Sequence, residues 1–383
     1  MSNFFGGKMK NIFIVYGGNS AEHDVSVVTA LSTYKRYNSK NFELQLLYIA
    51  RDGNWYVGDA LDKFSFYKAV DVKKLKRVTL TMGGAGELFW VKGKKLKPLT
   101  KIDFVINCCH GGEGENGNLV ALFEINKIAC TSGSALSLGA CMDKYFTKQV
   151  LLANGYPVLD FFKLNKEEFL PDADTLLRQM QTFGFPVVVK PVRQGSSIGV
   201  SLARDYDELK RALDLAFKFD TDAIVERAVM KKREFNVAVM CTANGLIVSE
   251  VDEPITEKTV ITFEDKYLAG RESGKKLKGS ASTLGMEFGE RKAPQISKKL
   301  RETMKKMALE LFADLNLCGV VRFDFLYDTE THKLFLGEMN AVPGSLGYYF
   351  FDEKTFLQDL IVGAENYWAK KFELKIEHYG IFK

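Results

Sequence analysis

Four polar side chains near the C-terminus have the types and the spacing of a metal-binding hairpin. Arg322 and Asp324 are two residues apart in one apolar segment, and Glu338 and Asn340 are two apart in the next. Side chains two apart on a strand point to the same face. A turn centred on Thr331 therefore places Asp324 opposite Glu338, and Arg322 then faces Asn340. Neighbouring carboxylates repel unless a cation lies between them, and their oxygens suit Mg²⁺ that carries the phosphates of a nucleotide.

The residues that follow Asn340 favour this interpretation. Ala341-Val-Pro-Gly344 predicts a rigid turn, which can present a backbone N–H beside the metal site. The alternative is a half-exposed hairpin whose polar face simply lies in water.

A second segment has the residue types of a loop that covers and binds phosphates. Lys190 ends the apolar run Val187-Val-Val, and Gly195-Ser-Ser-Ile-Gly199 follows shortly after it. The lysine can reach inward from the end of a strand, and a glycine-serine turn offers N–H groups and hydroxyls to phosphates. An edge-strand lysine followed by a surface turn is the alternative. The P-loop pattern G-x-x-x-x-G-K-[ST] is absent from the chain.

A third segment, His110-Gly-Gly112-Glu-Gly114-Glu-Asn-Gly117, contains a literal G-x-G-x-x-G between a predicted strand and a predicted helix. This pattern is the best argument for a dinucleotide-dependent oxidoreductase. However, no acidic residue lies between Glu124 and Asp143, so the carboxylate expected on the ribose about 20 residues further on is missing. His110 itself fits either a core histidine or a site residue.

The elements that must position these residues follow an α/β pattern. A strand over 10–16 leads through Gly17-Gly18 to a helix capped by Ser20, with Glu22 in its first turn. Further strands, a hairpin and a buried strand are predicted over 42–50, 78–91 and 102–109. Beyond them we expect a helix over 142–154, alternating strands and helices up to Glu226, a helix over 294–316 and a hairpin over 320–339. The polar stretch 253–290 has the length of a lid.

Composition narrows the class of protein. The chain has 383 residues, of which 46% are hydrophobic and 26% charged, with a net charge of +5, so it forms two or three globular domains rather than a disordered chain. No run approaches the roughly 20 apolar residues of a membrane span, which predicts a cytoplasmic protein without membrane contact. Its short lysine clusters lack interleaved aromatic residues, so nucleic acid binding is not expected. Six cysteines without C-x-x-C spacing predict buried, reduced thiols.

Taken in order, the segments resemble the D-alanine–D-alanine ligase family of the ATP-grasp superfamily. The markers are Gly17-Gly-Asn-Ser-Ala-Glu22-His-Asp-Val-Ser26, His110 to Gly117, Met142-Asp-Lys144, Val189-Lys190-Pro, Gly195 to Gly199, Lys266-Tyr267, Arg322-Phe-Asp324 and Gly337-Glu338-Met-Asn340-Ala-Val-Pro-Gly344. The resemblance implies a three-domain ATP-grasp fold with an N-terminal α/β, Rossmann-like domain. Domains would cover 1–132, 133–229 and 230–383, with ATP between the second and the third.

The resemblance also implies roles at the nucleotide. Lys144 and Lys190 would hold the α- and β-phosphates, Lys266 would approach the γ-phosphate, and Ser197 belongs to the same nucleotide site. Glu226 resembles the hinge residue that faces adenine, and Glu234 resembles the residue on the ribose. The metal ligands implied for two Mg²⁺ ions, with Mn²⁺ as an alternative, are Asp324, Glu338 and Asn340.

At the amino-acid substrates, the resemblance pairs Glu22 with the ammonium of the first D-alanine. Arg322 and the N–H of Gly344 would stabilise the developing oxyanion. His110, Ser196 and Tyr267 would complete the first subsite, with Ser196 and Tyr267 holding the lid down.

The chain departs from the family pattern at the second subsite. After Pro343-Gly344 the family usually shows Met-Thr-x-x-Ser, whose serine binds the carboxylate of the second substrate, but here Tyr349 takes the place of that serine. We predict D-alanine as both substrates, for peptidoglycan precursor synthesis, with D-serine or another small D-amino acid as the second choice. Tyr267 indicates an amino acid rather than D-lactate. A non-condensing ATP-binding module is a further alternative, and a homodimer is common in the family.

Overall fold

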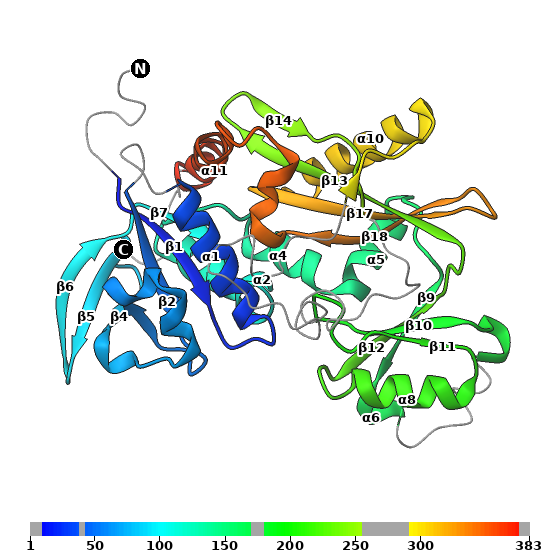
Figure 1. Cartoon of the computed structure of the whole chain (residues 1–383), viewed down its shortest axis with the longest axis horizontal. Coiled ribbons are helices and arrows are strands. Elements are labelled where there is room, and N and C mark those ends of the chain that lie inside the picture. The colour runs from blue at the N-terminus through cyan, green and yellow to red at the C-terminus, as the bar shows by residue number, and fades with distance from the viewer. Residues whose placement is uncertain (1–9, 38–42, 170–179, 255–290, 375–383) are drawn as a thin grey trace, which may run out of the picture.

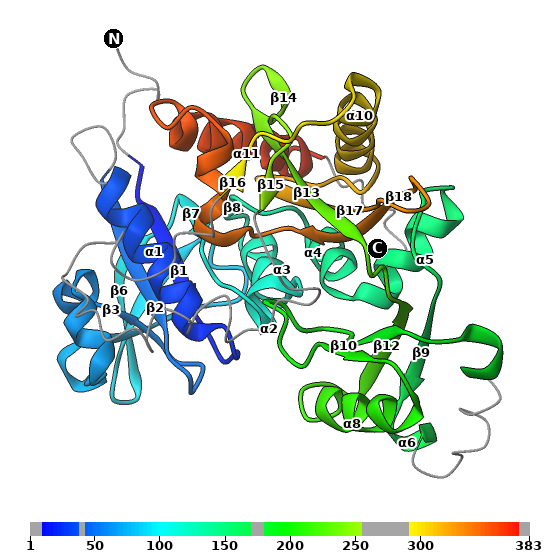
Figure 2. The same cartoon turned by 45° about the vertical axis from the view of Figure 1, so that its right-hand side comes forward.

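The computed structural model describes residues 10–37, 43–169, 180–254 and 291–374. Lys266, Tyr267 and nearly all of the polar stretch predicted as a lid lie outside the described residues. Three main sheets, a separate two-stranded sheet and their helices make up the described chain (Figures 1 and 2).

The first sheet has a parallel centre. Strand β1 (Ile12–Gly17) is buried along its whole length and pairs in parallel with β2 (Leu44–Ile49) and β7 (Phe104–Asn107). Beyond β7 lies the short β8 (Ala129–Cys130). Parallel strands covered on both faces have continuous apolar sequences, which is why the predicted strands over 10–16, 42–50 and 102–109 are found here.

An antiparallel extension continues this sheet beyond β2, giving the order β6-β5-β4-β3-β2-β1-β7-β8. Its strands are β3 (Trp55–Val57), β4 (Lys76–Leu80), β5 (Glu87–Lys92) and β6 (Lys95–Lys101), and the short helices η1 (Asp59–Asp62), η2 (Phe64–Lys68) and η3 (Val72–Lys74) precede β4. The hairpin predicted over 78–91 is confirmed as β4 and β5. Edge strand β6 was not predicted, because its exposed lysines and proline give no apolar alternation.

Helix α1 (His23–Tyr37) packs on β1 and begins three residues later than the predicted cap. The Glu22 carbonyl accepts the first helical N–H, from Ser26, at 3.0 Å. Ser20 instead accepts the N–H of Glu22 at 3.2 Å and donates to the His110 carbonyl at 2.7 Å. The prediction of Ser20 as the cap was therefore wrong, and Glu22 lies directly at the N-terminus of α1.

Four helices come after β7, two of them before β8 and two after it. They are α2 (Gly112–Glu115), α3 (Asn118–Ile125), α4 (Ala135–Met142) and α5 (Lys144–Ala153). Helix α5 confirms the helix predicted over 142–154, and the Asp143 side chain caps it by accepting the N–H of Phe146 at 2.8 Å.

The second sheet is antiparallel and has its own hydrophobic core. Its order is β11-β10-β12-β9, formed by β9 (Phe161–Asn165), β10 (Val187–Pro191), β11 (Ser201–Ala203) and β12 (Asp222–Arg227). Helix α8 (Tyr206–Ala216) packs Leu209 and Leu213 against Val187 and Val189. The short α6 (Lys166–Phe169) follows β9. In Figures 1 and 2 this sheet and α8 form the lower right part of the molecule.

The third sheet has the order β14-β13-β17-β18 and shares one core with the first. Its strands are β13 (Lys232–Thr242), β14 (Gly245–Val248), β17 (Val320–Asp328) and β18 (Leu334–Asn340); β15 (Glu253–Pro254) pairs with β16 (Arg291–Lys292) beside it. Helix α10 (Lys298–Asp314), the turn η5 (Gly344–Phe350) and α11 (Phe356–Phe372) complete the chain. Trp368 of α11 donates to the Cys130 carbonyl of β8 at 2.9 Å, which joins the two sheets.

Two expectations from composition can be compared with this fold. All six cysteines are buried and free, as predicted. Within the described ranges, no helix is long and apolar enough to cross a membrane.

Gly363 allows α11 to approach β13 closely, because an added Cβ would lie 2.2 Å from the Cys241 carbonyl oxygen. We expect Gly363→Ala to lower the free energy of unfolding by about 1–3 kcal/mol through overpacking. Urea unfolding followed by circular dichroism measures this. Asn366→Ala, on the exposed face of the same helix, is the control and should change stability by less than about 0.5 kcal/mol. A Gly363→Ala protein as stable as the wild type would contradict the packing described.

Candidate functional site

The hairpin β17–β18 has the predicted register. Arg322 pairs with Asn340 and Asp324 with Glu338, and a bulge follows immediately after Asp324. The polar side chains of the two strands therefore lie side by side on one face, as strand periodicity requires.

Asp324 is the most densely bonded carboxylate of this face. Arg322 donates to its two oxygens at 2.7 and 2.8 Å. Two amides add to these bonds, Asn236 of β13 at 2.7 Å and Asn340 at 2.9 Å. Burial favours a lower pKa for Arg322, but Asp324 raises it well above the ordinary value, so the guanidinium stays charged.

The donor set fits a hard divalent cation. Oxygen ligands are offered from adjacent strand positions by Asp324, Glu338 and Asn340. The positively charged guanidinium of Arg322 already lies against Asp324, where a metal ion would also be attracted. Within residues 10–37, 43–169, 180–254 and 291–374, no three or more His, Cys, Asp or Glu side chains form a metal cluster. Such an ion would therefore complete its coordination with phosphate oxygens and water, as Mg²⁺ usually does.

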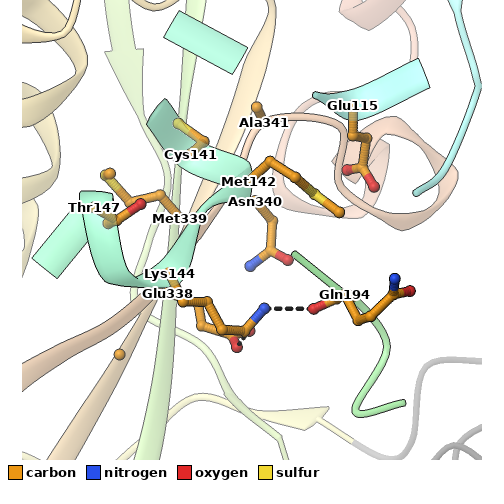
Figure 3. Close-up of a pocket in the computed structure, with 12 residues that line it drawn as sticks. Glu115, Cys141, Met142, Lys144, Thr147, Gln194, Glu338, Met339, Asn340 and Ala341 are labelled. Carbon is orange, nitrogen blue, oxygen red and sulfur yellow. Dashed lines mark hydrogen bonds and ion pairs between the residues drawn. The ribbon is translucent and has the colours of Figure 1, made fainter. Parts of the chain in front are cut away.

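Helix α5 brings two lysines to two different sheets. The Lys144 Nζ atom lies 3.6 Å from Glu338 of β18 and also donates to the Gln194 carbonyl (Figure 3). One turn later, the Lys148 Nζ atom lies 3.0 Å from Glu226 of β12. The helix thus carries positive charge to both the second and the third sheet.

Glu226 forms a buried triad with two lysines. Its carboxylate lies 3.0 Å from Lys148 and 2.7 Å from Lys190. Burial alone would raise the pKa of Glu226, but the two ammonium groups lower it to about 2. The triad carries one excess positive charge in a place with little water, which favours the approach of an anion.

Glu22 and Ser196 meet between the first and second sheets, where the Ser196 hydroxyl donates to the Glu22 carboxylate. Ser196 and Ser197 have left-handed φ values of 50° and 60°, uncommon for residues with a side chain. Gly195 lies against the same carboxylate, because a Cβ at this position would lie 2.6 Å from Glu22 Oε2. Strained turns of this kind occur at ligand sites.

His110 is held against α1. Its ring Nε2 lies 2.9 Å from the Thr29 hydroxyl, and its backbone N–H donates to Ser26 at 2.8 Å. Burial, helped by the charge of Arg322, lowers the pKa of His110 to about 4. The ring is therefore neutral at pH 7.

The turn η5 follows the hairpin and packs against α1. Tyr349 is hydrogen-bonded to Arg322, which brings the residue that replaces the family serine to the polar face. Ser345, Leu346 and Gly347 all have left-handed backbones, with φ of 51°, 56° and 67°.

Arg36, near the C-terminal end of α1, contacts η5 through Tyr348. It donates to the Tyr348 hydroxyl at 2.9 Å and lies 4.0 Å from the centre of that ring.

The remaining predicted residues are placed as follows. Glu234 of β13 forms an ion pair with Lys232 at 2.6 Å. Gly344 begins η5, and Lys266 and Tyr267 fall outside the described residues.

Three side chains of the site were not predicted from the sequence: Lys148, Asn236 and Glu115. Lys148 follows Lys144 by four residues in a predicted helix, a spacing that places both on one face and was a usable signal. Asn236 and Glu115 gave no signal beyond their residue type.

Comparison with known proteins decides the family. The model of the D-ala D-ala ligase N-terminus matches residues 11–133, and that of the D-ala D-ala ligase C-terminus matches residues 150–353. The chain belongs to the D-alanine–D-alanine ligase family. The resemblance derived from the motifs is thereby confirmed.

Individual relatives agree with this assignment. The D-alanine–D-alanine ligase of Thermosipho africanus is 31% identical, over 91% of this chain and 90% of its own. The crystal structure of the D-alanine–D-alanine ligase from Helicobacter pylori is 25% identical with a TM-score of 0.72, covering 92% of this chain and 98% of that one. The VanG D-Ala:D-Ser ligase from Enterococcus faecalis, 22% identical with a TM-score of 0.70 over 95% and 99% of the two chains, shares the fold. The predicted ATP-grasp fold class is confirmed.

The triad of this ligase gives a pH-dependent prediction. A glutamate whose pKa falls from 4.5 to about 2 stabilises the fold by about 3 kcal/mol above pH 4.5, and this is lost as the pH falls towards 2. We expect Glu226→Gln to lower stability by a similar amount at pH 7 and to flatten the stability curve between pH 4.5 and 2. Denaturant unfolding at several pH values tests this. Asp160→Asn, in the exposed pair with Arg227 at 3.3 Å, is the control, and equal effects of the two changes would refute the buried triad.

The contact between Gly195 and Glu22 gives a second prediction. In Gly195→Ala the new Cβ must displace the Glu22 carboxylate, the predicted partner of the first substrate's ammonium. We expect the KM for the first D-alanine to rise by roughly tenfold, about 1.4 kcal/mol, while the KM for ATP changes less than twofold. Steady-state kinetics measure both. Ile198→Val, in the same turn, is the control; an unchanged KM in Gly195→Ala would disprove the role given to Glu22.

Proposed function

We propose that the protein phosphorylates one D-alanine with ATP and then joins it to a second D-alanine, supplying a peptidoglycan precursor. Its family membership makes it an ATP-dependent ligase. The observation that carries the mechanism is the convergence of ammonium groups and carboxylates from separate parts of the chain. Lys144 lies 3.6 Å from Glu338, and the charge of that carboxylate also acts on Lys190.

Formation of the acyl phosphate, the first step, needs ammonium groups gathered around the phosphates. A carboxylate does not react with an amine, so it must first become an acyl phosphate, which requires phosphoryl transfer between two anions. Lys144 and Lys190 would reduce the repulsion by binding the α- and β-phosphates, and Lys266 would act on the γ-phosphate. On binding, the triphosphate oxygens would replace Glu226 and Glu338 as partners of Lys190 and Lys144.

Divalent cations would complete the charge balance. When bound, Mg²⁺ offsets phosphate charge and orients the transferred group. We propose two such ions, with Mn²⁺ as a substitute, held by Asp324, Glu338 and Asn340.

The nucleotide base would lie between the second and third sheets, beside the adjoining ends of β12 and β13. Glu226 at the end of β12 and Glu234 at the start of β13 are the proposed neighbours of adenine and ribose. Because the Glu226 carboxylate is already bonded to two lysines, a bound adenine would contact its backbone more readily than its side chain. Ser197 would contribute from the turn after β10.

The second step is attack by an amine on the acyl phosphate. Arg322 and the N–H of Gly344 would stabilise the oxyanion of the tetrahedral intermediate, since preorganised donors stabilise developing charge most effectively. Glu22 would hold the first ammonium, with His110, Ser196 and Tyr267 around it. Closure of a lid that carries Tyr267 would keep water from the intermediate.

The second subsite distinguishes this chain from the usual family pattern. Tyr349, bonded to Arg322, would donate its hydroxyl hydrogen to the carboxylate of the second D-alanine. We further propose a division into three domains near residues 132 and 229, a cytoplasmic location and a homodimer.

Phosphate release from ATP tests the proposal. We expect release that depends on D-alanine and on Mg²⁺, yields D-alanyl-D-alanine, and is weaker with D-serine as second substrate and weakest with D-lactate. Release without any dipeptide would indicate a non-condensing module, and a preference for D-lactate would refute the role of Tyr267. Binding of NAD(H) without ATP hydrolysis would overturn the proposal.

Glu338→Gln tests the metal-binding face. Removing this charge should lower kcat by roughly 10²–10³-fold and raise the Mg²⁺ concentration needed for half-maximal rate. Stability should change little, because Glu338 is partly exposed and its ion pair is long. The control is Glu330→Gln, at the turn of the same hairpin and paired with Lys231 at 2.8 Å. Full activity of Glu338→Gln at low Mg²⁺ would argue against a metal at this face.

A further inference from the structure

Glu115 is an acidic side chain of the pocket to which the proposed steps give no role. It ends α2 and lines the pocket together with Lys144, Gln194, Glu338 and Asn340. In the view of Figure 3, its carboxylate and that of Glu338 lie at opposite ends, with Asn340 between them. One pocket thus has an acid from the first domain facing the metal-binding hairpin.

Glu115 and Glu22 approach the same glycine. The N–H of Gly111 donates to Glu115 Oε2 at 2.6 Å, and a Cβ on Gly111 would lie 2.7 Å from Glu22 Oε2. Glu22 is the proposed partner of the first ammonium. The carboxylate of Glu115 therefore lies next to the first amino-acid subsite rather than at the adenine end.

The surroundings of Glu115 disfavour its charged form. Burial is the largest effect, and together with the negative charge of Glu22 it raises the pKa of Glu115 to about 8. The Gly111 N–H, Lys144 and Arg322 act in the opposite direction. Burial raises the pKa of the nearby Cys109 and Cys141 thiols, and the charge of Glu115 adds to both shifts.

The second reaction step requires a proton acceptor. The incoming amino acid arrives as an ammonium ion, whose nitrogen has no lone pair for attack on the acyl phosphate. We propose that Glu115 is the base that accepts this proton. The inference rests on the proposed function and adds to it a catalytic residue for the second amine.

The step balances as follows. One N–H bond of the ammonium breaks and its proton goes to a Glu115 oxygen. The freed lone pair forms the C–N bond, and the C–O bond to phosphate breaks with its electron pair leaving on inorganic phosphate. The attacking nitrogen then loses its second proton to the departing phosphate, which leaves a neutral amide. Glu115 then returns the proton to water.

The other carboxylates of the site are less suitable as the base that deprotonates the second amine. Asp324 already accepts four hydrogen bonds, from Arg322, Asn236 and Asn340. Glu338 pairs with Lys144, and Glu22 accepts from Ser196. A general base works best when its pKa is near the working pH, which Glu115 satisfies.

The triphosphate and its metal ions carry opposite charges, so together they change the net charge of the pocket little.

Hydroxylamine separates the two steps, because it is uncharged at neutral pH and attacks the acyl phosphate without losing a proton first. We expect Glu115→Gln to lower kcat for the dipeptide by roughly 10²–10⁴-fold. Formation of D-alanyl hydroxamate from ATP, D-alanine and hydroxylamine should fall less than about threefold by the same reasoning. Glu113→Gln, on the exposed side of the same short helix, is the matched control and should form both products at the wild-type rate.

The pH profile gives a second measurement. A base acts in its deprotonated form, so kcat for the wild-type dipeptide reaction should rise as the pH passes through about 8. That rise should be absent from the hydroxamate reaction and from Glu115→Gln, and Glu115→Asp should retain it at a lower rate.

Several results would overturn the inference. Equal loss of dipeptide and hydroxamate in Glu115→Gln would mean that Glu115 only shapes the site, and an unchanged dipeptide rate would exclude it as the base. A misfolded Glu115→Gln would leave the decision to Glu115→Asp and the wild-type profile. Failure of the wild type to form either product would instead refute the proposed function.

Discussion

Charge compensation in a poorly hydrated site is the constraint on which this structure depends. An ionised group that leaves water must find an opposite charge or several hydrogen bonds. Asp324 finds both in Arg322 and two amides, and Glu226 finds two ammonium groups. These pairings keep cations and carboxylates close together before any ligand arrives. Under the proposed function, a nucleotide with its metal ions would exchange partners within this set rather than assemble it.

Helix α5 has a central place in this arrangement. Its two lysines, one turn apart, reach Glu338 on the third sheet and Glu226 on the second. The second sheet has its own core, whereas the third shares a core with the first. The helix therefore joins the separately cored second sheet to the third sheet through ion pairs of the candidate site.

The sequence predicted most of what depends on short-range periodicity. The register of β17 and β18 follows from a two-residue repeat, and the buried strands of the first sheet follow from continuous apolar runs. Lys148 was missed because a lysine in a helix is usually solvated, and only the tertiary fold shows that it faces Glu226. The cap of α1 was misplaced because Ser20 was assumed to bond its own helix, whereas its hydroxyl donates to His110, a contact between segments 90 residues apart.

Helix α1 has 15 residues and is about 22 Å long, with Glu22 at one end and Arg36 at the other. Its start borders the proposed first amino-acid subsite, and Arg36 at its end donates to Tyr348, the neighbour of Tyr349 in the proposed second subsite. A helix resists bending, so a tilt at one end is transmitted along its whole length. A ligand that shifts α1 at either end would therefore disturb both proposed subsites at once.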